Sequence, residues 1–401
     1  MINIGILKEE KHKTDKRVPF TPKQSKYIEN EFGLKIYCQS SKIRCFSNDE
    51  YTKENIEVRN NLSNCDIFFG IKEVDEDKLV EGKKYLFFSH TIKKQGYNRI
   101  MLKKIIEKKI SLIDYECIKD DKQKRIVAFG KIAGIVGAYN AILGYGKKLG
   151  IYKLKRCFQY NNYNELKNEC NKMKLPKIKI LVLGNGKVAK GVIEILKIMK
   201  IKEVKKDSFK KSKFENPVYC QIESKDYYKS KNRSEFSKKI FYKNPEKYKS
   251  DFKEFMRTTD ILINATYWRK GIPKLFTIND MNSKNFSIKL IADISCDIEG
   301  LIPCTKKSST IQNPFYDYDS EKNQIKKPFE NKKFVSVMAI DNLPSELPKD
   351  ASKDFGDQLI NHVLKPLTMK KNIHSKIIQN ATITEKGKLT KNFLYLKDYV
   401  S

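Results

Sequence analysis

Residues 178–196 read IKILVLGNGKVAKGVIEIL, in which an apolar strand, a glycine-rich turn and an amphipathic helix follow one another without interruption. The turn, GNGKVA, has small residues at the three positions where dinucleotide-binding Rossmann domains have them. Gly184 permits the tight turn, and Gly186 lets the backbone approach a pyrophosphate. The helix that begins at Lys187 and Val188 offers free N–H groups to phosphates. The sequence therefore predicts that these four residues bind NAD or NADP.

The acid that binds the adenosine ribose is expected at the end of the second strand of such a unit. Asp207 fits, because it lies about 20 residues after Gly184. A carboxylate there would bind the 2′-hydroxyl of NAD and repel the 2′-phosphate of NADP. Glu203 is an alternative, and Lys205 and Lys206 could hold a 2′-phosphate. The choice between NAD and NADP stays open.

Strand and helix patterns also alternate in the first part of the chain. Residues 2–7, 34–38, 65–71, 85–89 and 111–115 are short apolar runs, and amphipathic stretches lie between them. This alternation predicts parallel strands that are covered by helices.

The chain is expected to form two lobes. A long apolar helix is predicted over residues 132–149, and residues 202–257 form a basic, tyrosine-rich insertion. We predict an α/β fold of two Rossmann-like lobes with parallel sheets and an active-site cleft between them. Residues 1–138 plus 340–401 would bind the substrate, and residues 139–339 would form the NAD(P)-binding domain.

Polar side chains follow three successive apolar runs of the first lobe. Lys72 ends FGIK, His90 ends FFSH, and Glu116 ends LIDYE. The carboxyl ends of parallel strands line one crevice, so we expect these three side chains to converge.

The net charge of +33 raises the question of a polyanionic partner. Only nine of the 81 basic residues are arginine, the residue whose planar fork grips phosphate by two bonds. The lysine excess is typical of an AT-rich coding sequence. Residues 202–257 hold 17 basic and nine acidic residues, and they are the best support for the distant alternative, a basic nucleic-acid-binding protein. We predict no nucleic-acid partner.

Cysteine and histidine usage argues against a metal centre. The nine cysteines form no C-x-x-C pair, and only four histidines occur, at positions 12, 90, 362 and 374. No run reaches the roughly 18 apolar residues of a membrane span, and the first residues lack a signal-peptide pattern. We expect a cytoplasmic protein with reduced thiols, no metal and no membrane contact.

Motifs along nearly the whole chain resemble lysine-forming saccharopine dehydrogenases, and most of all the lysine–2-oxoglutarate reductase branch. These belong to the superfamily of alanine dehydrogenase and transhydrogenase. The resembling segments are DKRVPFTP, FGIKE, FFSHTIKKQ, LIDYE, RIVAFGKIAGIVGAYN, INATYW, ADISCDIEG, IDNLPSELPKDASKDFGDQL and ATITEKGKLTKNFLYL. The reductase branch is favoured by FSHTIKKQ, by IDNLP, by TYW at 266–268 and by the insertion.

The resemblance implies roles for individual residues. Lys72 and His90 would be the catalytic acid/base pair. Arg17, Lys93 and Arg125 would face substrate carboxylates. Glu73 and Glu116 would tune the charge or receive the lysine amine. The loop at Asp293 would lie at the nicotinamide, with Asn342 and Leu343 on the facing lobe. Tyr267, which follows the strand NAT, is expected to line the cleft.

The implied reaction interconverts saccharopine, NAD(P)+ and water with L-lysine, 2-oxoglutarate and NAD(P)H. It would serve lysine synthesis or breakdown and act on small-molecule substrates. An alternative within the superfamily is an alanine dehydrogenase-like enzyme that uses pyruvate and ammonia. Oligomeric state is not predicted.

Overall fold

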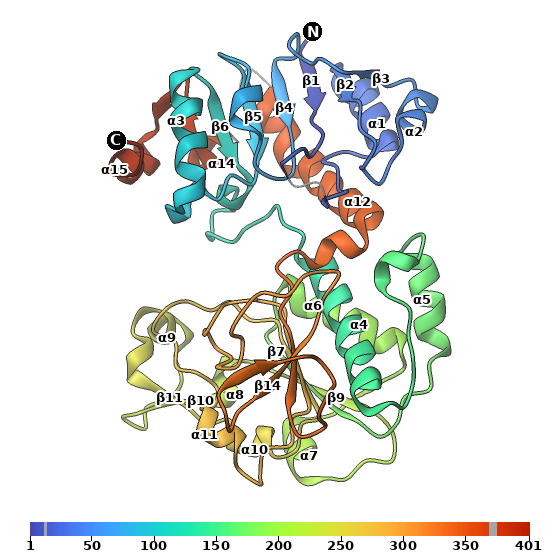
Figure 1. Ribbon diagram of the computed structural model, residues 1–401. Helices are drawn as coiled ribbons and strands as arrows, with labels where there is room; N and C mark the ends of the chain where they lie inside the picture. Colours follow the sequence, from blue (N-terminus) through green and yellow to red (C-terminus); the bar gives the residue numbers. More distant parts are fainter. Residues whose placement is uncertain (12–13, 369–374) are drawn as a thin grey trace. The chain divides into compact units, whose positions relative to one another are not determined.

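The computed structural model describes residues 1–11, 14–368 and 375–401. The chain forms two compact units (Figure 1). Unit 1 consists of Met1–Phe129 and Pro348–Ser401, and unit 2 of Gly130–Leu347. Unit 2 is therefore inserted into the chain of unit 1. None of the helices in the described ranges is both long enough and apolar enough to cross a membrane.

Unit 1 is built on an eight-stranded sheet of order β18-β17-β6-β5-β4-β1-β2-β3. The strands are β1 (Asn3–Ile6), β2 (Lys35–Gln39), β3 (Glu57–Arg59), β4 (Ile67–Phe69), β5 (Lys84–Phe87), β6 (Ser111–Asp114), β17 (Thr382–Glu385) and β18 (Lys388–Leu389). The strands from β3 to β6 in this order are parallel, whereas β17 pairs antiparallel with both β6 and β18.

Local sequence explains the helices of unit 1. The first, α1 (Pro22–Phe32), begins after the N-cap Thr21, whose side chain and that of Gln24 form a capping box. It ends at Gly33, which has left-handed backbone angles. The other helices are α2 (Asn48–Lys53), α3 (Arg99–Glu107), α12 (Pro348–Leu359), α13 (Lys365–Thr368), α14 (Ser375–Ala381) and α15 (Lys397–Val400).

Unit 2 has its own eight-stranded sheet, of order β15-β14-β16-β13-β12-β7-β9-β8. The strands are β7 (Lys179–Leu183), β8 (Lys202–Glu203), β9 (Val218–Ile222), β12 (Ile261–Asn264), β13 (Leu290–Asp293), β14 (Tyr316–Asp319), β15 (Gln324–Lys326) and β16 (Val335–Met338). Only β14 and β15 run antiparallel to their neighbours. The predicted α/β class with two mainly parallel sheets is confirmed.

The helices α4 (Gly130–Leu149) and α6 (Lys187–Ile198) pack closely in unit 2. A Cβ added to Gly134 would lie 1.9 Å from the carbonyl oxygen of Val188, and one on Gly191 would lie 2.0 Å from that of Lys131. The two backbones therefore touch where glycine leaves room, which anchors all of α4 on unit 2. The remaining helices of this unit are α5 (Tyr163–Lys172), α7 (Lys206–Lys211), α8 (Ser224–Tyr227), α9 (Lys238–Lys243), α10 (Lys253–Met256) and α11 (Ile278–Met281).

The division of the chain differs from the predicted one at both crossings. The first lies at residue 130 rather than 139, because α4 packs on α6 along its length. The second lies at 348 rather than 340, because the short helix η7 (Leu343–Glu346) is held by α4. Asn140 of α4 donates to Glu346 Oε1 at 2.8 Å.

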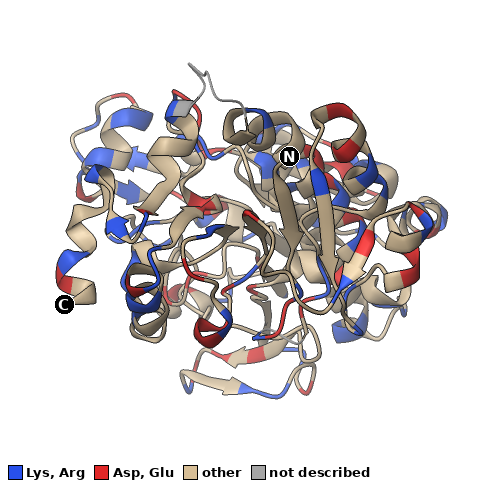
Figure 2. Cartoon of the chain, turned by 90° about the horizontal axis from the view of Figure 1, so that it is seen from above, with Lys and Arg blue, Asp and Glu red and all other residues tan. Residues whose placement is uncertain are grey.

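The basic insertion predicted over residues 202–257 contains part of the sheet itself. It carries β8 and β9, and β9 lies directly beside β7. It also carries the hairpin of β10 (Tyr228–Ser230) and β11 (Tyr248–Ser250). Figure 2 shows Lys and Arg distributed among helices, strands and loops together with Asp and Glu.

Candidate active site

Three neighbouring strands of unit 1 end at one edge of the sheet, and each is followed by a predicted site residue. Lys72 follows β4, His90 follows β5, and Glu116 follows β6, and these strands are adjacent and parallel. Parallel strands end at the same edge, as the sequence analysis expected for these three residues.

His90 is held by a buried carboxylate. Its Nδ1 lies 2.6 Å from Oε1 of Glu73, whose side chain is only 3% exposed. Asn98 donates to the same oxygen at 3.4 Å. His90 has left-handed backbone angles (φ 52°), a conformation that costs a non-glycine residue about 1–3 kcal/mol and concentrates at functional sites. With Nδ1 donating to Glu73, Nε2 is the nitrogen that can exchange protons.

Lys72 is positioned by a carboxyl group that the sequence analysis missed. Glu9 Oε1 accepts from the amide of Ile71 at 2.7 Å, and Oε2 accepts from the amide of Lys72 at 3.0 Å. Burial raises the pKa of Glu9 to about 8, and Asp15 adds to the shift. Glu9, Lys72 and Glu73 line a small cavity of about 50 Å³. The signal was available, because Glu9 follows β1, which pairs with β4.

Arg17 forms a buried ion pair. Its Nε lies 2.9 Å from Asp15 Oδ1 and its Nη2 lies 2.5 Å from Oδ2. The guanidinium also lies over the ring of Phe129, 4.2 Å from the centroid. Burial alone would raise the pKa of Asp15, but Arg17 and also Lys72 hold it below its usual range. Much of the guanidinium fork is thus engaged within unit 1.

Two exposed cations flank Glu116. Lys93 Nζ lies 3.5 Å from Glu116 Oε1, and Arg125 Nη1 lies 3.6 Å from the same oxygen. The other oxygen, Oε2, is buried and has no hydrogen-bond partner among the described residues. Lys93 and Arg125 are therefore accessible to an anionic ligand, and Oε2 of Glu116 can accept a hydrogen bond from a ligand.

Asp114 connects the loops that carry His90 and Glu116. Its Oδ2 accepts from the amide and the hydroxyl of Ser89, at 3.1 and 2.5 Å. Its Oδ1 accepts from the amide of Glu116 at 2.7 Å. Burial raises the pKa of Asp114, whereas the Ser89 hydrogen bond opposes the rise.

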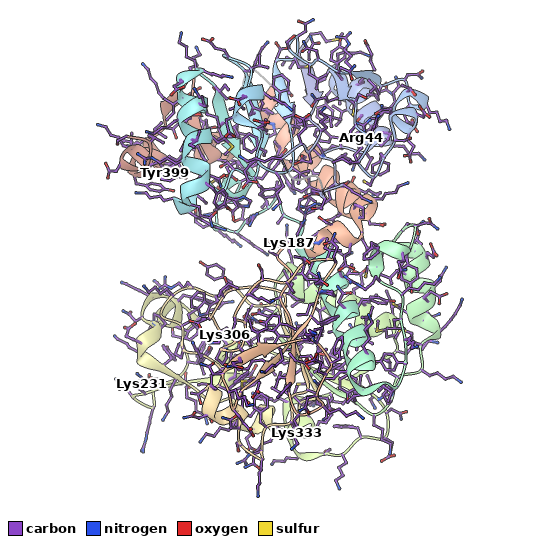
Figure 3. The ribbon with its side chains drawn as sticks, in the orientation of Figure 1. Arg44, Lys187, Lys231, Lys306, Lys333 and Tyr399 are labelled. Atoms are coloured by element: carbon purple, nitrogen blue, oxygen red, sulfur yellow. The ribbon has the colours of Figure 1, made fainter. Side chains whose placement is uncertain are left out.

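The glycine loop of unit 2 has the geometry that a dinucleotide requires. Gly184 has φ 101°, and a Cβ there would lie 2.7 Å from the carbonyl oxygen of Ala265. Gly186 is the N-cap of α6, and a Cβ there would meet nothing within 4 Å. Lys187, labelled in Figure 3, is the first residue of α6, and Val188 packs towards α4. Open space therefore adjoins the helix N-terminus, where phosphates bind.

A cavity of about 430 Å³ adjoins this loop. Gly184 and Gly186 line it on one side, and Glu223 at the end of β9 lines it on another. Tyr267, a predicted cofactor residue, also lines it. The residues present fit the adenosine side of NAD(P).

Neither Asp207 nor Glu203 lines the cavity beside the glycine loop. Asp207 lies on α7, its side chain is 71% exposed, and its nearest cation is Lys210 at 3.4 Å. The alternative, Glu203, lies on the edge strand β8. The reason is strand order: β9 separates β8 from β7, so the acid next to the glycine loop is Glu223.

The other predicted cofactor residues lie elsewhere in unit 2. Asp293 is buried and accepts from Asn264 at 2.9 Å and from Thr305 at 2.7 Å. These hydrogen bonds favour a role for Asp293 in holding the loop that follows β13. Burial raises its pKa to about 6. Asn342 and Leu343 were expected on the facing lobe, but they belong to unit 2.

No cluster of three metal-ligating side chains occurs within the described ranges. His12 and His374 fall outside those ranges.

Residues 5–136 match the family described as "Alanine dehydrogenase/PNT, N-terminal domain". All seven residues predicted to be catalytic or to bind the substrate lie within the matched residues 5–136.

Curated relatives match almost the whole chain. It is 28% identical to the mitochondrial alpha-aminoadipic semialdehyde synthase of Rattus norvegicus, over 98% of this chain and 47% of the relative. It is 29% identical to the alpha-aminoadipic semialdehyde synthase of Arabidopsis thaliana, over 98% of this chain and 41% of the relative. The chain thus spans less than half the length of these relatives. The saccharopine dehydrogenase [NAD(+), L-lysine-forming] of Candida glabrata is 25% identical, over 88% of this chain and 89% of the relative.

Solved structures share the fold. An L-alanine dehydrogenase superposes with a TM-score of 0.66 at 13% identity, and the match covers 100% of both chains. A transhydrogenase from Sinorhizobium meliloti gives 0.61 at 12% identity, over 97% of this chain and 100% of that chain. The two-unit chain therefore has an alanine dehydrogenase-like fold.

Proposed function

We propose that the protein is an NAD(P)-dependent oxidoreductase that interconverts saccharopine and water with L-lysine and 2-oxoglutarate. The observation that carries the proposal is the strand-edge cluster in which Lys72 adjoins the Glu73–His90 pair. The match to saccharopine dehydrogenases and alpha-aminoadipic semialdehyde synthases supports it.

The substrate explains why a base and several cations are needed. Saccharopine has three carboxylates and a secondary amine, and the carbon beside the amine can lose a hydride only when the amine is neutral. A bound NAD(P)+ would supply the acceptor for that hydride. Lys72 removes the amine proton, and the carbon–nitrogen bond becomes an imine.

His90 then manages the protons of hydrolysis. Water adds to the imine carbon, a proton moves to nitrogen, and the carbon–nitrogen bond breaks to give lysine and 2-oxoglutarate. Imidazole suits repeated proton exchange near neutral pH, and Glu73 fixes the ring orientation. In the reverse direction the same groups condense lysine with 2-oxoglutarate.

Charged residues around Glu116 bind the substrate ends. Lys93 and Arg125 are exposed beside the carboxylate and bind substrate carboxylates by charge-assisted hydrogen bonds. The unpartnered Oε2 of Glu116 accepts from the lysine amine. Arg17 contributes to the positive potential, although Asp15 occupies much of its fork.

The cofactor is bound by unit 2. The amides at Gly186, Lys187 and Val188, at the start of α6, would hold the pyrophosphate. Glu223 takes the ribose role that was predicted for Asp207, because it ends the strand beside β7 and lines the same cavity as the glycines.

A second candidate is an alanine dehydrogenase-like reaction, which the fold similarity to an L-alanine dehydrogenase favours. The test follows oxidation of NADH and of NADPH with lysine plus 2-oxoglutarate, beside pyruvate plus ammonia. Activity with the first pair supports the proposal, whereas activity only with pyruvate and ammonia overturns it.

A further inference from the structure

The cavity beside the glycine loop has a second wall that comes from the segment 202–257. Phe236, Lys238 and Tyr242 of this segment line it, opposite the loop residues. Tyr267, which follows β12, completes the lining with a third aromatic ring.

The aromatic rings of this wall are supported from behind. Phe241 is fully buried, and its ring lies 5.3 Å from the ring of Phe236 and 5.3 Å from that of Tyr242, measured between centroids. Tyr242 lies 6.4 Å from Tyr267, with the ring planes at 47°. The core therefore fixes Phe236 and Tyr242, while each keeps a face for the cavity.

Tyr267 is unusual in its exposure. Its side chain is 71% exposed, although a large aromatic ring gains free energy when it is buried. A flat ring that lies open beside a cavity, with a second ring 6.4 Å away, suits a planar ligand that covers it.

The position of the wall along the ligand follows from the rest of the cavity. The pyrophosphate belongs at Gly186 and the N-terminus of α6, and the adenosine ribose belongs at Glu223. The group attached to that ribose is a planar base, and the aromatic residues share the cavity with Glu223.

We propose that Phe236, Tyr242 and Tyr267 form an adenine-binding wall, so that the segment 202–257 is part of the cofactor site. The proposal rests on the proposed function only in that the ligand is an adenine dinucleotide. Stacking of a base on an aromatic side chain is sequence-tolerant and commonly changes affinity by about tenfold per ring.

The test measures binding of ADP-ribose to the full chain by titration calorimetry. ADP-ribose contains the adenine, the ribose and the pyrophosphate but no nicotinamide, so the result does not depend on catalysis. We expect the wild type to bind it and Tyr267→Ala and Tyr242→Ala each to bind it about tenfold more weakly. Tyr242→Phe should bind like the wild type, because the ring remains.

Ile240→Ala is the matched control, because Ile240 lies on the same helix, α9, is exposed, and does not line the cavity. Unchanged affinity of Tyr267→Ala and Tyr242→Ala for ADP-ribose would overturn the proposal. An equal loss in Ile240→Ala would also overturn it, because the effect would then not be specific to the wall. If the wild type binds ADP-ribose but does not turn over lysine and 2-oxoglutarate, the proposed reaction fails and the wall stands.

Discussion

Replacing Glu9 by glutamine should change how the stability of the protein depends on pH. Burial, with a contribution from Asp15, raises the pKa of Glu9 from its usual 4.5 to about 8. Between these values the folded chain keeps a proton that the unfolded chain releases. The stabilising contribution is thus fully present below pH 4.5 and is lost as the pH rises to about 8. At about 1.4 kcal/mol per pKa unit, the loss amounts to roughly 5 kcal/mol.

Glutamine has no proton to release, so the variant lacks this pH dependence. It offers one carbonyl oxygen to the two amides, of Ile71 and Lys72, that the carboxyl group accepts. The lost hydrogen bond costs about 1 kcal/mol. We therefore expect Glu9→Gln to be about as stable as the wild type near pH 5 and more stable above pH 8.

The assay is urea unfolding followed by far-UV circular dichroism at intervals between about pH 5 and pH 9. Glu10→Gln is the matched control. Slight burial raises the pKa of Glu10, but Lys78 and Lys8 outweigh it and hold this pKa below its usual range. Replacing Glu10 should therefore change the free energy of unfolding by the same amount at all of these pH values. A difference between Glu9→Gln and the wild type that is equally constant would refute the reasoning.

Three further predictions concern catalysis, cofactor choice and packing. Lys72→Met and His90→Gln should each slow turnover by about 100-fold or more in steady-state assays, and near-normal turnover in both would contradict their acid/base roles. Glu223→Gln should raise kcat/KM for NADPH relative to NADH, because a carboxylate repels the 2′-phosphate, whereas Asp207→Asn should leave the ratio unchanged. Gly134→Ala should lower the free energy of unfolding by about 1–3 kcal/mol, because the new Cβ overlaps the backbone of α6; an unchanged urea midpoint would show that the helices separate without cost.

The common sheet edge of Lys72, His90 and Glu116 could be predicted because it depends on local patterns and one general rule. Each apolar run of unit 1 reads as a strand, and parallel strands place the residues that follow them at one edge. Lys72, His90 and Glu116 therefore follow three adjacent strands, although Glu116 lies 44 positions after Lys72 in the sequence. Glu9 also follows a strand of this sheet, β1. Its neighbours Lys8 and Glu10 are charged, however, so the sequence there looks like an exposed turn.

The position of Glu223 beside the glycine loop could not be predicted, because strand order is a tertiary property. The two-residue strand β8 is exposed and directly follows α6 and a short turn, which makes it look like the second strand of the unit. The true neighbour of β7 is β9, whose residues lie in a segment dominated by lysine and tyrosine. The predicted boundaries of the units differ from those of the structure for a similar reason. The glycine contacts between α4 and α6 depend on tertiary packing and leave no periodic pattern in the sequence.

The insertion of unit 2 into the chain of unit 1 has a consequence during synthesis. The amide of Leu112 in β6 donates to Thr384 in β17, a residue 272 positions later. At about 5–20 residues per second, a ribosome needs roughly 15 to 55 s to make that intervening chain. Throughout this interval the first part of unit 1 has an open edge at β6, the kind of edge at which nascent chains pair with one another. The whole of Gly130–Leu347 emerges before β17 can close that edge, so the order of synthesis favours a folded unit 2 while unit 1 is still incomplete.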